Sequence, residues 1–225
     1  MFSHLDLLFS TTPLEGPEQM AFDEVLLGQV ERPLLRVYCW KSACVTFGYF
    51  QKQELVKALY PNDDLVRRWS GGGCVEHRED FTFSLMIPEK EPIVIQRASL
   101  FYRQLHEAIV IVLRDHQIKA CLATLEDQVV GASCFVAPCP CDVMLDQKKI
   151  VGGAQRRSRG RLLHQGSIQI KNRRWEIENR RNFFISLAKQ LAPEVALLKE
   201  NSVWLAEAHE LALERYRSRE WLEKR

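Results

Sequence analysis

The chain of 225 residues is 46% hydrophobic and 27% charged, and its five tryptophans and eleven phenylalanines supply enough apolar mass for a sizeable core. This composition excludes a disordered chain, a collagen-like protein and a low-complexity repeat. Because 31 Lys and Arg residues stand against 29 Asp and Glu, the formal charge is only +2, which argues against a nucleic-acid-binding protein.

Segments with the periods of helices and strands alternate along the first half of the chain. A helix is expected over residues 18–30, with Phe22 and Leu26 on one side of it. The clearest strand covers residues 81–87, whose large apolar side chains alternate with polar ones. Further strands are predicted at residues 5–9, 34–40, 44–49 and 65–69.

The second half begins with the strongest helical pattern, over residues 97–116. Residues 142–145 and 149–151 are predicted to form a hairpin, and residues 162–170 a further strand. The tail, residues 178–225, is expected to be helical. With no internal repeat and no long linker, the chain is expected to form one domain of the α/β (α+β) class over its whole length.

A glycine-rich loop follows the strand predicted at residues 65–69. It reads Arg67-Arg68-Trp69-Ser70-Gly71-Gly72-Gly73. Glycines let the backbone approach a ligand closely, and successive N–H groups can hold an anion or a carbonyl oxygen. The two arginines suit a phosphate or a carboxylate. The alternative is a flexible hairpin loop without a ligand.

A second glycine pair follows a lysine, in Lys149-Ile150-Val151-Gly152-Gly153-Ala154-Gln155. A lysine at the start of a strand could place its ammonium over a site where the backbone comes close. The alternative is an exposed turn lysine. Because a lysine at the start of a strand can be changed with little loss of packing, Lys149→Ala is expected to leave thermal stability nearly intact. Since adjacent side chains on a strand point to opposite faces, Lys148 and Lys149 cannot both face such a site.

Three cysteines and two histidines complete the candidates for chemistry. Cys134, Cys139 and Cys141 have no common zinc-site spacing, so no metal site is expected. Cys134 lies among small residues, where a nearby Lys or Arg would favour the nucleophilic thiolate. His77 and His164 could equally be ordinary hydrogen-bonding residues.

The N-terminal sequence has no basic segment and no small-residue cleavage site, so no secretory signal is expected. No run approaches the roughly 18 apolar residues that span a membrane. A cytoplasmic protein with free thiols is therefore expected.

The order of the motifs is more specific than any one of them. Along the chain they are Met20-Ala21-Phe22-Asp23-Glu24, Trp40 with Gly48-Tyr49-Phe50-Gln51, the Arg67–Gly73 loop with His77, the Lys149–Gln155 segment, and His164-Gln165-Gly166-Ser167-Ile168. Together they resemble the lipoate-protein ligase and octanoyltransferase family, which shares a catalytic domain with biotin protein ligases. The resemblance covers about residues 20–170.

Within that family the chain is most similar to the Cys-dependent octanoyltransferases. Asp80-Phe81-Thr82-Phe83-Ser84 and Ser133-Cys134-Phe135 both match that branch, whereas the H-D-x-G-N of ATP-using ligases is absent. The other octanoyltransferase branch carries a cysteine beside its late H-G element, and His164-Gln165-Gly166-Ser167 has none.

The resemblance implies a single domain with a mixed β-sheet flanked by helices, as in biotin and lipoate ligases. It also implies transfer of an octanoyl group from acyl carrier protein to a lysine of a lipoyl domain or of glycine cleavage H protein. Cys134 would be the nucleophile and Lys149 its catalytic partner. The residues implied to bind substrate are Arg67, Arg68, Ser70, Gly71, Gly72, Gly73, His77, Gly152, Gly153, Ala154, Gln155, His164 and Gly166. Neither a cofactor nor a metal is implied, and no nucleic acid or membrane is expected as a partner.

Three alternatives remain open at the level of sequence. One is a transferase that moves octanoyl or lipoyl groups between two acceptor proteins. An ATP-dependent lipoate-protein ligase would use ATP and Mg²⁺. A non-catalytic acyl- or carrier-binding protein on the same scaffold would use the basic segment 156–161 to hold an acidic carrier or nucleic acid. Glu76 and Arg78 depart from the family pattern on either side of His77, and they are expected to alter the entrance of an acyl pocket.

Overall fold

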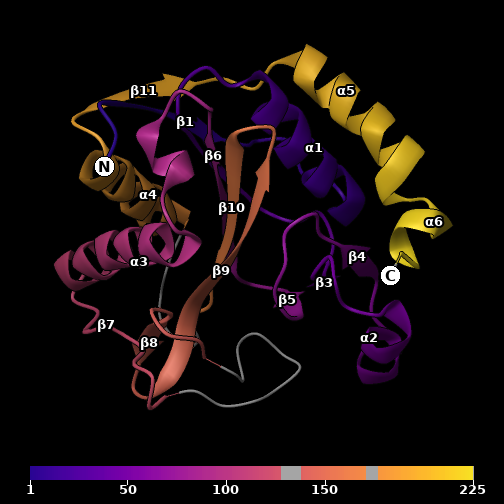
Figure 1. Ribbon diagram of the computed structural model, residues 1–225, viewed down its shortest axis with the longest axis horizontal. Helices are drawn as coiled ribbons and strands as arrows, with labels where there is room; N and C mark the ends of the chain where they lie inside the picture. Colours follow the sequence, from indigo (N-terminus) through magenta and orange to yellow (C-terminus); the bar gives the residue numbers. More distant parts are fainter. Residues whose placement is uncertain (128–137, 171–176, 225) are drawn as a thin grey trace.

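The computed structural model describes residues 1–127, 138–170 and 177–224, and its main feature is an eight-stranded mixed β-sheet (Figure 1). Three strands at one side run parallel and the remaining neighbours are antiparallel. In spatial order the strands are β11 (Glu194–Leu198), β1 (His4–Phe9), β2 (Leu34–Tyr38), β6 (Phe81–Ile87), β10 (Arg161–Ile168), β9 (Lys148–Ser158), β8 (Val143–Leu145) and β7 (Cys121–Leu122).

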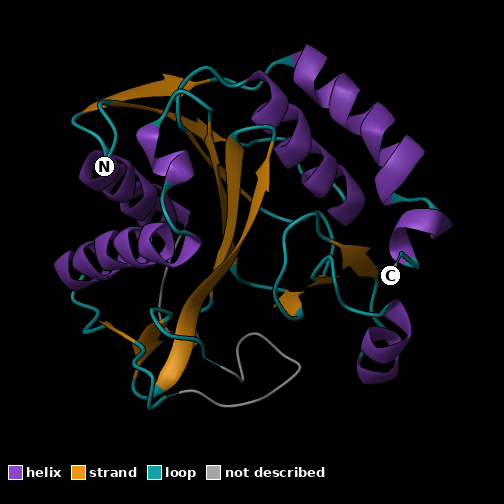
Figure 2. Cartoon of the chain, viewed as in Figure 1, coloured by secondary structure: helices purple, strands orange, loops and turns teal. Residues whose placement is uncertain are grey.

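Helices cover both faces of this sheet (Figure 2). On one face, α3 (Ala98–Asp115) and α4 (Ile177–Leu191) enclose the larger hydrophobic core. On the other, α1 (Gly16–Gln29) and α5 (Ser202–Leu211) enclose a second core. The residues of β6 are all buried, and Leu85 and Met86 enter different cores, because consecutive side chains of a strand point to opposite faces. This mixed sheet between helices confirms the predicted fold class.

A three-stranded sheet lies beside the start of α1, in the order β4 (Leu65–Arg67), β3 (Cys44–Phe47), β5 (Val75–His77). The glycine-rich loop connects β4 to β5. The remaining elements are the helices α2 (Gln53–Leu59) and α6 (Arg219–Leu222), the 3₁₀ helix η1 (Pro92–Ile95) and the π-helix η2 (Ala212–Tyr216).

The expectation that the tail is helical is wrong in one place. Between α4 and α5 the chain forms β11, which pairs in parallel with β1 from the other end of the sequence. β11 lies at the edge of the sheet and has no fully buried side chain, so its sequence lacks the alternation by which a strand is recognised. The other predicted helices and strands are confirmed with small shifts of their ends, except that the strand predicted at residues 149–151 continues to Ser158 as β9. The elements β5, β7 and α2 were not predicted.

Among the described residues, no helix has both the length and the apolar character needed to cross a membrane.

Candidate functional site

A narrow cavity, with a free volume of about 30 Å³, lies where the small sheet meets the central strands of the main sheet. Six of the predicted site residues line it, namely Arg68, His77, Gly152, Gly153, Ala154 and Gly166. The other lining residues are Met20, Tyr38, Trp40, Thr46, Val75, Thr82, Gln165 and Ser167. The fold therefore brings the β4–β5 loop region and the β9–β10 hairpin, about 80 residues apart in sequence, to one place.

His77 forms one wall of the cavity. Its ring stacks on Trp40 with 4.1 Å between ring centroids, its Nδ1 lies 2.8 Å from Asp80 Oδ2, and its Nε2 lies 2.8 Å from Thr46 Oγ1. Arg68 Nη1 donates to the same threonine oxygen over 2.7 Å. Since a guanidinium only donates, the Thr46 hydroxyl can give its own hydrogen to Nε2, which leaves Nδ1–H facing Asp80.

Asp80 gathers the hydrogen bonds of the wall behind His77. Its Oδ2 accepts from Thr82 Oγ1 over 2.8 Å and from Ser167 Oγ over 2.7 Å, and Trp40 Nε1 donates to the Thr82 hydroxyl over 2.7 Å. Burial by itself raises the pKa of Asp80, but the His77 ring and the two hydroxyl donors outweigh it and hold that pKa below its ordinary value. The carboxylate thus orders three of the cavity's lining side chains.

The glycine loop takes its shape from Arg68. Arg68 Nη2 donates to the carbonyl oxygens of Gly71, over 2.9 Å, and of Gly73, over 2.7 Å. Gly72 has φ of +86°, a conformation that only glycine adopts without strain. Ser70 Oγ donates to Oε1 of Gln165, a lining residue, over 2.5 Å. Gly71, Gly72 and Gly73 do not line the cavity themselves, whereas Arg68 does.

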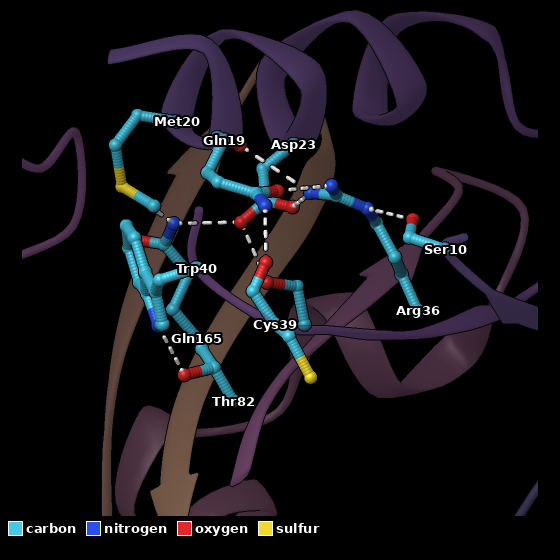
Figure 3. Close-up of polar contacts among 10 residues, drawn as sticks. Ser10, Gln19, Met20, Asp23, Arg36, Cys39, Trp40, Thr82 and Gln165 are labelled. Atoms are coloured by element: carbon cyan, nitrogen blue, oxygen red, sulfur yellow. Dashed lines mark hydrogen bonds and ion pairs between the residues drawn. The ribbon is translucent and has the colours of Figure 1, made fainter. Parts of the chain in front are cut away.

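A fully buried ion pair supports the cavity from the α1 side (Figure 3). Arg36 Nη1 donates to Asp23 Oδ1 over 2.7 Å, and the guanidinium lies between the rings of Phe22 and Tyr38. Asp23 Oδ2 accepts from Gln165 Nε2 over 2.8 Å. Asp23 thereby fixes the amide of Gln165, which faces the cavity.

Lys149 is buried, and the expectation that it can be replaced with little loss of packing is wrong. Its Nζ lies 2.8 Å from Asp142 Oδ2, and both side chains are almost inaccessible to solvent. Ile150 is an extra residue of β9 opposite β8, and such a bulge re-aims neighbouring side chains. The Lys149 ammonium runs so close to Gly152 that a Cβ there would lie 2.6 Å from it. Lys148 is exposed, as the alternation of a strand predicts.

Tyr102, from α3, contacts the ion pair of Lys149 and Asp142. Its hydroxyl donates to Asp142 Oδ1 over 2.5 Å and accepts from the Gly153 N–H over 3.0 Å. That N–H is therefore engaged and not free to stabilise an oxyanion. Sequence reasoning missed both Tyr102 and Asp142. Asp142 could have been predicted from the sequence, because an acid on the opposite arm of the predicted hairpin is a natural partner for the lysine.

Three further predicted residues lie away from the cavity. Gln155 donates from Nε2 to the Ala98 carbonyl on the α3 side of the sheet, over 3.1 Å. His164 is fully buried on that same side, 5.8 Å from the Phe83 ring centroid. Arg67 is also fully buried, and its guanidinium is held by backbone carbonyls. Glu76 and Arg78 are exposed and paired with each other, and neither lines the cavity.

Cys134 lies outside the described residues. Within the described ranges, no group of three or more His, Cys, Asp or Glu side chains could hold a metal ion.

A larger groove, of about 830 Å³, lies between the β9–β10 hairpin and the C-terminal helices. Arg156 lies 5.2 Å from the Tyr49 and Trp69 ring centroids there. Its lining carries Glu24, Glu89, Glu214 and Glu220 as well as basic residues. This mixture of charges gives little support to a site for an acidic carrier.

Two buried histidines predict loss of stability in acid. Burial lowers the pKa of His106 to about 4, and burial with the nearby His106 lowers that of His164 well below 6.5. Between pH 6.5 and about 4 the unfolded chain binds protons that the folded protein cannot, so stability falls as the pH falls. The lowered pKa of His106 alone would reduce the free energy of unfolding by about 3 kcal/mol over this pH range. Urea unfolding at pH 7.5, 6 and 4.5 measures this, and an unchanged midpoint would contradict it. His164→Leu should flatten the profile.

Comparison with known proteins gives matches along most of the chain. The family model described as "Lipoyl protein ligase A/B catalytic domain" matches residues 15–192. The octanoyltransferase LipM of Clostridioides difficile (strain 630) is 35% identical over 166 residues, which are 68% of this chain and 61% of that protein. The LipM of Staphylococcus aureus (strain NCTC 8325 / PS 47) is 32% identical over 165 residues, covering 66% and 60%. The chain thus matches about three fifths of the length of these relatives.

Solved structures share the fold. A crystal structure of lipoate-protein ligase A bound with ATP has a TM-score of 0.77 and 23% identity, with 99% of both chains covered. A bipartite lipoate protein ligase from Thermoplasma acidophilum, described with its E2 lipoyl domain, has a TM-score of 0.69 and 21% identity, covering 99% of this chain and 96% of that one. At these identities the likeness shows the architecture alone.

Proposed function

The chain belongs to the lipoyl protein ligase A/B catalytic domain family, and from that premise we propose that it is an octanoyltransferase. It moves an octanoyl group from acyl carrier protein to a lysine of a lipoyl domain or of glycine cleavage H protein. The observation that carries the proposal is the buried Lys149 ammonium, which is held by Asp142 and lies against Gly152, a residue that lines the cavity. The similarity to LipM octanoyltransferases supports it.

The reaction proceeds in two steps. The Cys134 thiolate attacks the donor thioester, the carrier's thiol leaves, and an octanoyl thioester forms on Cys134. The acceptor lysine amine then attacks that thioester, an amide forms, an amine proton is lost, and Cys134 is released. The Lys149 ammonium favours the thiolate in the first step and assists proton transfer in the second.

The octanoyl chain occupies the cavity beside Trp40 and His77. The free volume of about 30 Å³ is too small for eight carbons, so the lining side chains must move apart as the chain enters. Burial of the chain stabilises the complex by on the order of 0.8 kcal/mol per CH₂. The thioester supplies the free energy of transfer, so the proposal needs neither ATP nor a metal, and it places the enzyme in the cytoplasm with acidic carrier domains as its partners.

Intact-mass spectrometry tests this proposal. After mixing with octanoyl acyl carrier protein in the absence of ATP, the protein should gain one octanoyl group, and an added lipoyl domain should remove it. If no group is gained, but an acceptor is lipoylated when lipoate, ATP and Mg²⁺ are supplied, the protein is a ligase. If neither reaction occurs while octanoate still binds, the protein is a non-catalytic acyl-binding protein.

A further inference from the structure

Arg67 and Arg68 are adjacent but serve different parts of the molecule. The Arg67 guanidinium is fully buried against the Phe47 ring, 4.6 Å from its centroid. Its Nη1 donates to the carbonyls of Tyr49, over 2.6 Å, and Gln51, over 2.7 Å. Its Nε and Nη2 both donate to the carbonyl of Leu222, over 3.2 and 2.7 Å. A guanidinium group whose N–H donors are used in this way by main-chain carbonyls is unsuited to binding a substrate.

The turn that Arg67 holds is packed directly on the glycine loop. The Tyr49 N–H donates to the Ser70 carbonyl over 2.9 Å. Gly48 approaches the loop so closely that a Cβ on it would lie 2.0 Å from the Gly72 carbonyl oxygen. The loop therefore rests on this turn on one side and is tied by Arg68 on the other.

The last described helix, α6, also contacts Arg67, since it lies beside β4, which ends at this residue (Figure 1). Trp221 Nε1 donates to the Arg67 carbonyl over 3.1 Å, and its buried ring lies 5.7 Å from that of Tyr49. Trp221 and Leu222, the C-terminal clasp, thus contact Arg67 through its backbone and through its side chain. Both residues lie beyond residue 192, where the match to the family model ends.

We propose that Arg67 is a positioning residue which, completed by the C-terminal clasp, holds the glycine loop in place through the turn at Tyr49 and Gln51. The Leu222 carbonyl accepts two of the four hydrogen bonds of the guanidinium, and hydrogen bonds from a buried charged donor are among the stronger ones. The importance of the loop for catalysis rests on the proposed function, whereas its positioning does not.

Amide hydrogen exchange of the full chain, without substrate, tests the positioning. In Arg67→Lys, the ammonium cannot reach all three carbonyls, so amides of residues 48–51 and 70–74 should exchange about tenfold faster together with those of 219–224. Amides of β10 should keep their protection. Trp221→Phe keeps an aromatic ring but removes the Nε1–H, and it should give a smaller rise at the same positions. It also carries the test if Arg67→Lys does not fold.

Arg219→Ala is the matched control. Arg219 lies on the same helix, is exposed, and pairs with Glu223, so its loss should leave residues 70–74 unchanged. Faster exchange confined to 219–224, or an equal rise at every amide, would overturn the proposal. Weaker octanoate binding by Arg67→Lys with unchanged exchange of residues 70–74 would also overturn it, since Arg67 would then be a ligand. Failure of the wild-type protein to take up octanoate would instead count against the proposed function alone.

Discussion

Cys134→Ala is expected to abolish both the octanoyl adduct and transfer to an acceptor. The reason is chemical: the two-step reaction passes through a thioester on this sulfur, and an alanine methyl group cannot form one. Loss of a nucleophile typically reduces the rate by several orders of magnitude. Intact mass measures the adduct, and a gel-shift or mass assay of the acceptor measures transfer.

Cys139→Ala is the control for this experiment. Cys139 is an exposed thiol only a few residues away in sequence, and its side chain has no part in the proposed reaction. The variant should form the adduct and transfer octanoate at the parent rate. Transfer at the parent rate by Cys134→Ala would eliminate the thioester mechanism. Loss of activity in both variants would point to damage of the segment rather than to the loss of a nucleophile.

Lys149→Ala is expected to lose both activity and stability. Removing the ammonium leaves the Asp142 carboxylate buried without its counter-charge, and breaking a buried pair in this way costs about 3–5 kcal/mol. Formation of the adduct should slow at neutral pH and recover in part at higher pH, because the thiolate then forms without help. Urea unfolding gives the stability, and the rate of mass gain gives the first step.

Lys148→Ala separates this role from a diffuse basic surface. Lys148 is exposed, and its replacement should change the free energy of unfolding by less than about 0.5 kcal/mol and leave activity intact. Lys149→Met combined with Asp142→Asn should regain much of the stability, because no unpaired buried charge remains, but no activity. Equal losses of activity in Lys148→Ala and Lys149→Ala would contradict the specific role.

Local pattern was enough to predict most of the secondary structure, and long-range contact explains the rest. The strand at Phe81–Ile87 and the helix at Ala98–Asp115 carry their own periodicity, and both are confirmed. The strand at Glu194–Leu198 exists because β1 offers it an edge, and no property of those five residues reveals that partner. The β5 strand, Val75–His77, is too short to show a period.

The sequence motifs predicted which segments form the candidate site, but they did not predict which way each side chain in those segments points. Arg67 and Arg68 look equivalent in sequence, yet only Arg68 reaches the cavity. The sequence could have separated Gln165 from His164, because alternate residues of a strand share a face and Ser167 falls with Gln165. Tyr102 could not have been found, since its contact with Asp142 depends on how α3 packs against β8.

The pairing of β1 with β11 has a consequence for biosynthesis. His4 lies opposite Glu194 in the sheet, so the ribosome must add about 190 residues before β1 has both of its neighbours. At 5–20 residues per second that interval lasts roughly 10–40 s. Throughout it, a strand rich in leucine exposes an unpaired edge, which is a template for association with other nascent chains. The sheet gains this last strand only once Leu198 has been added, so a ribosome that stalls before Leu198 would leave a nascent chain prone to aggregation.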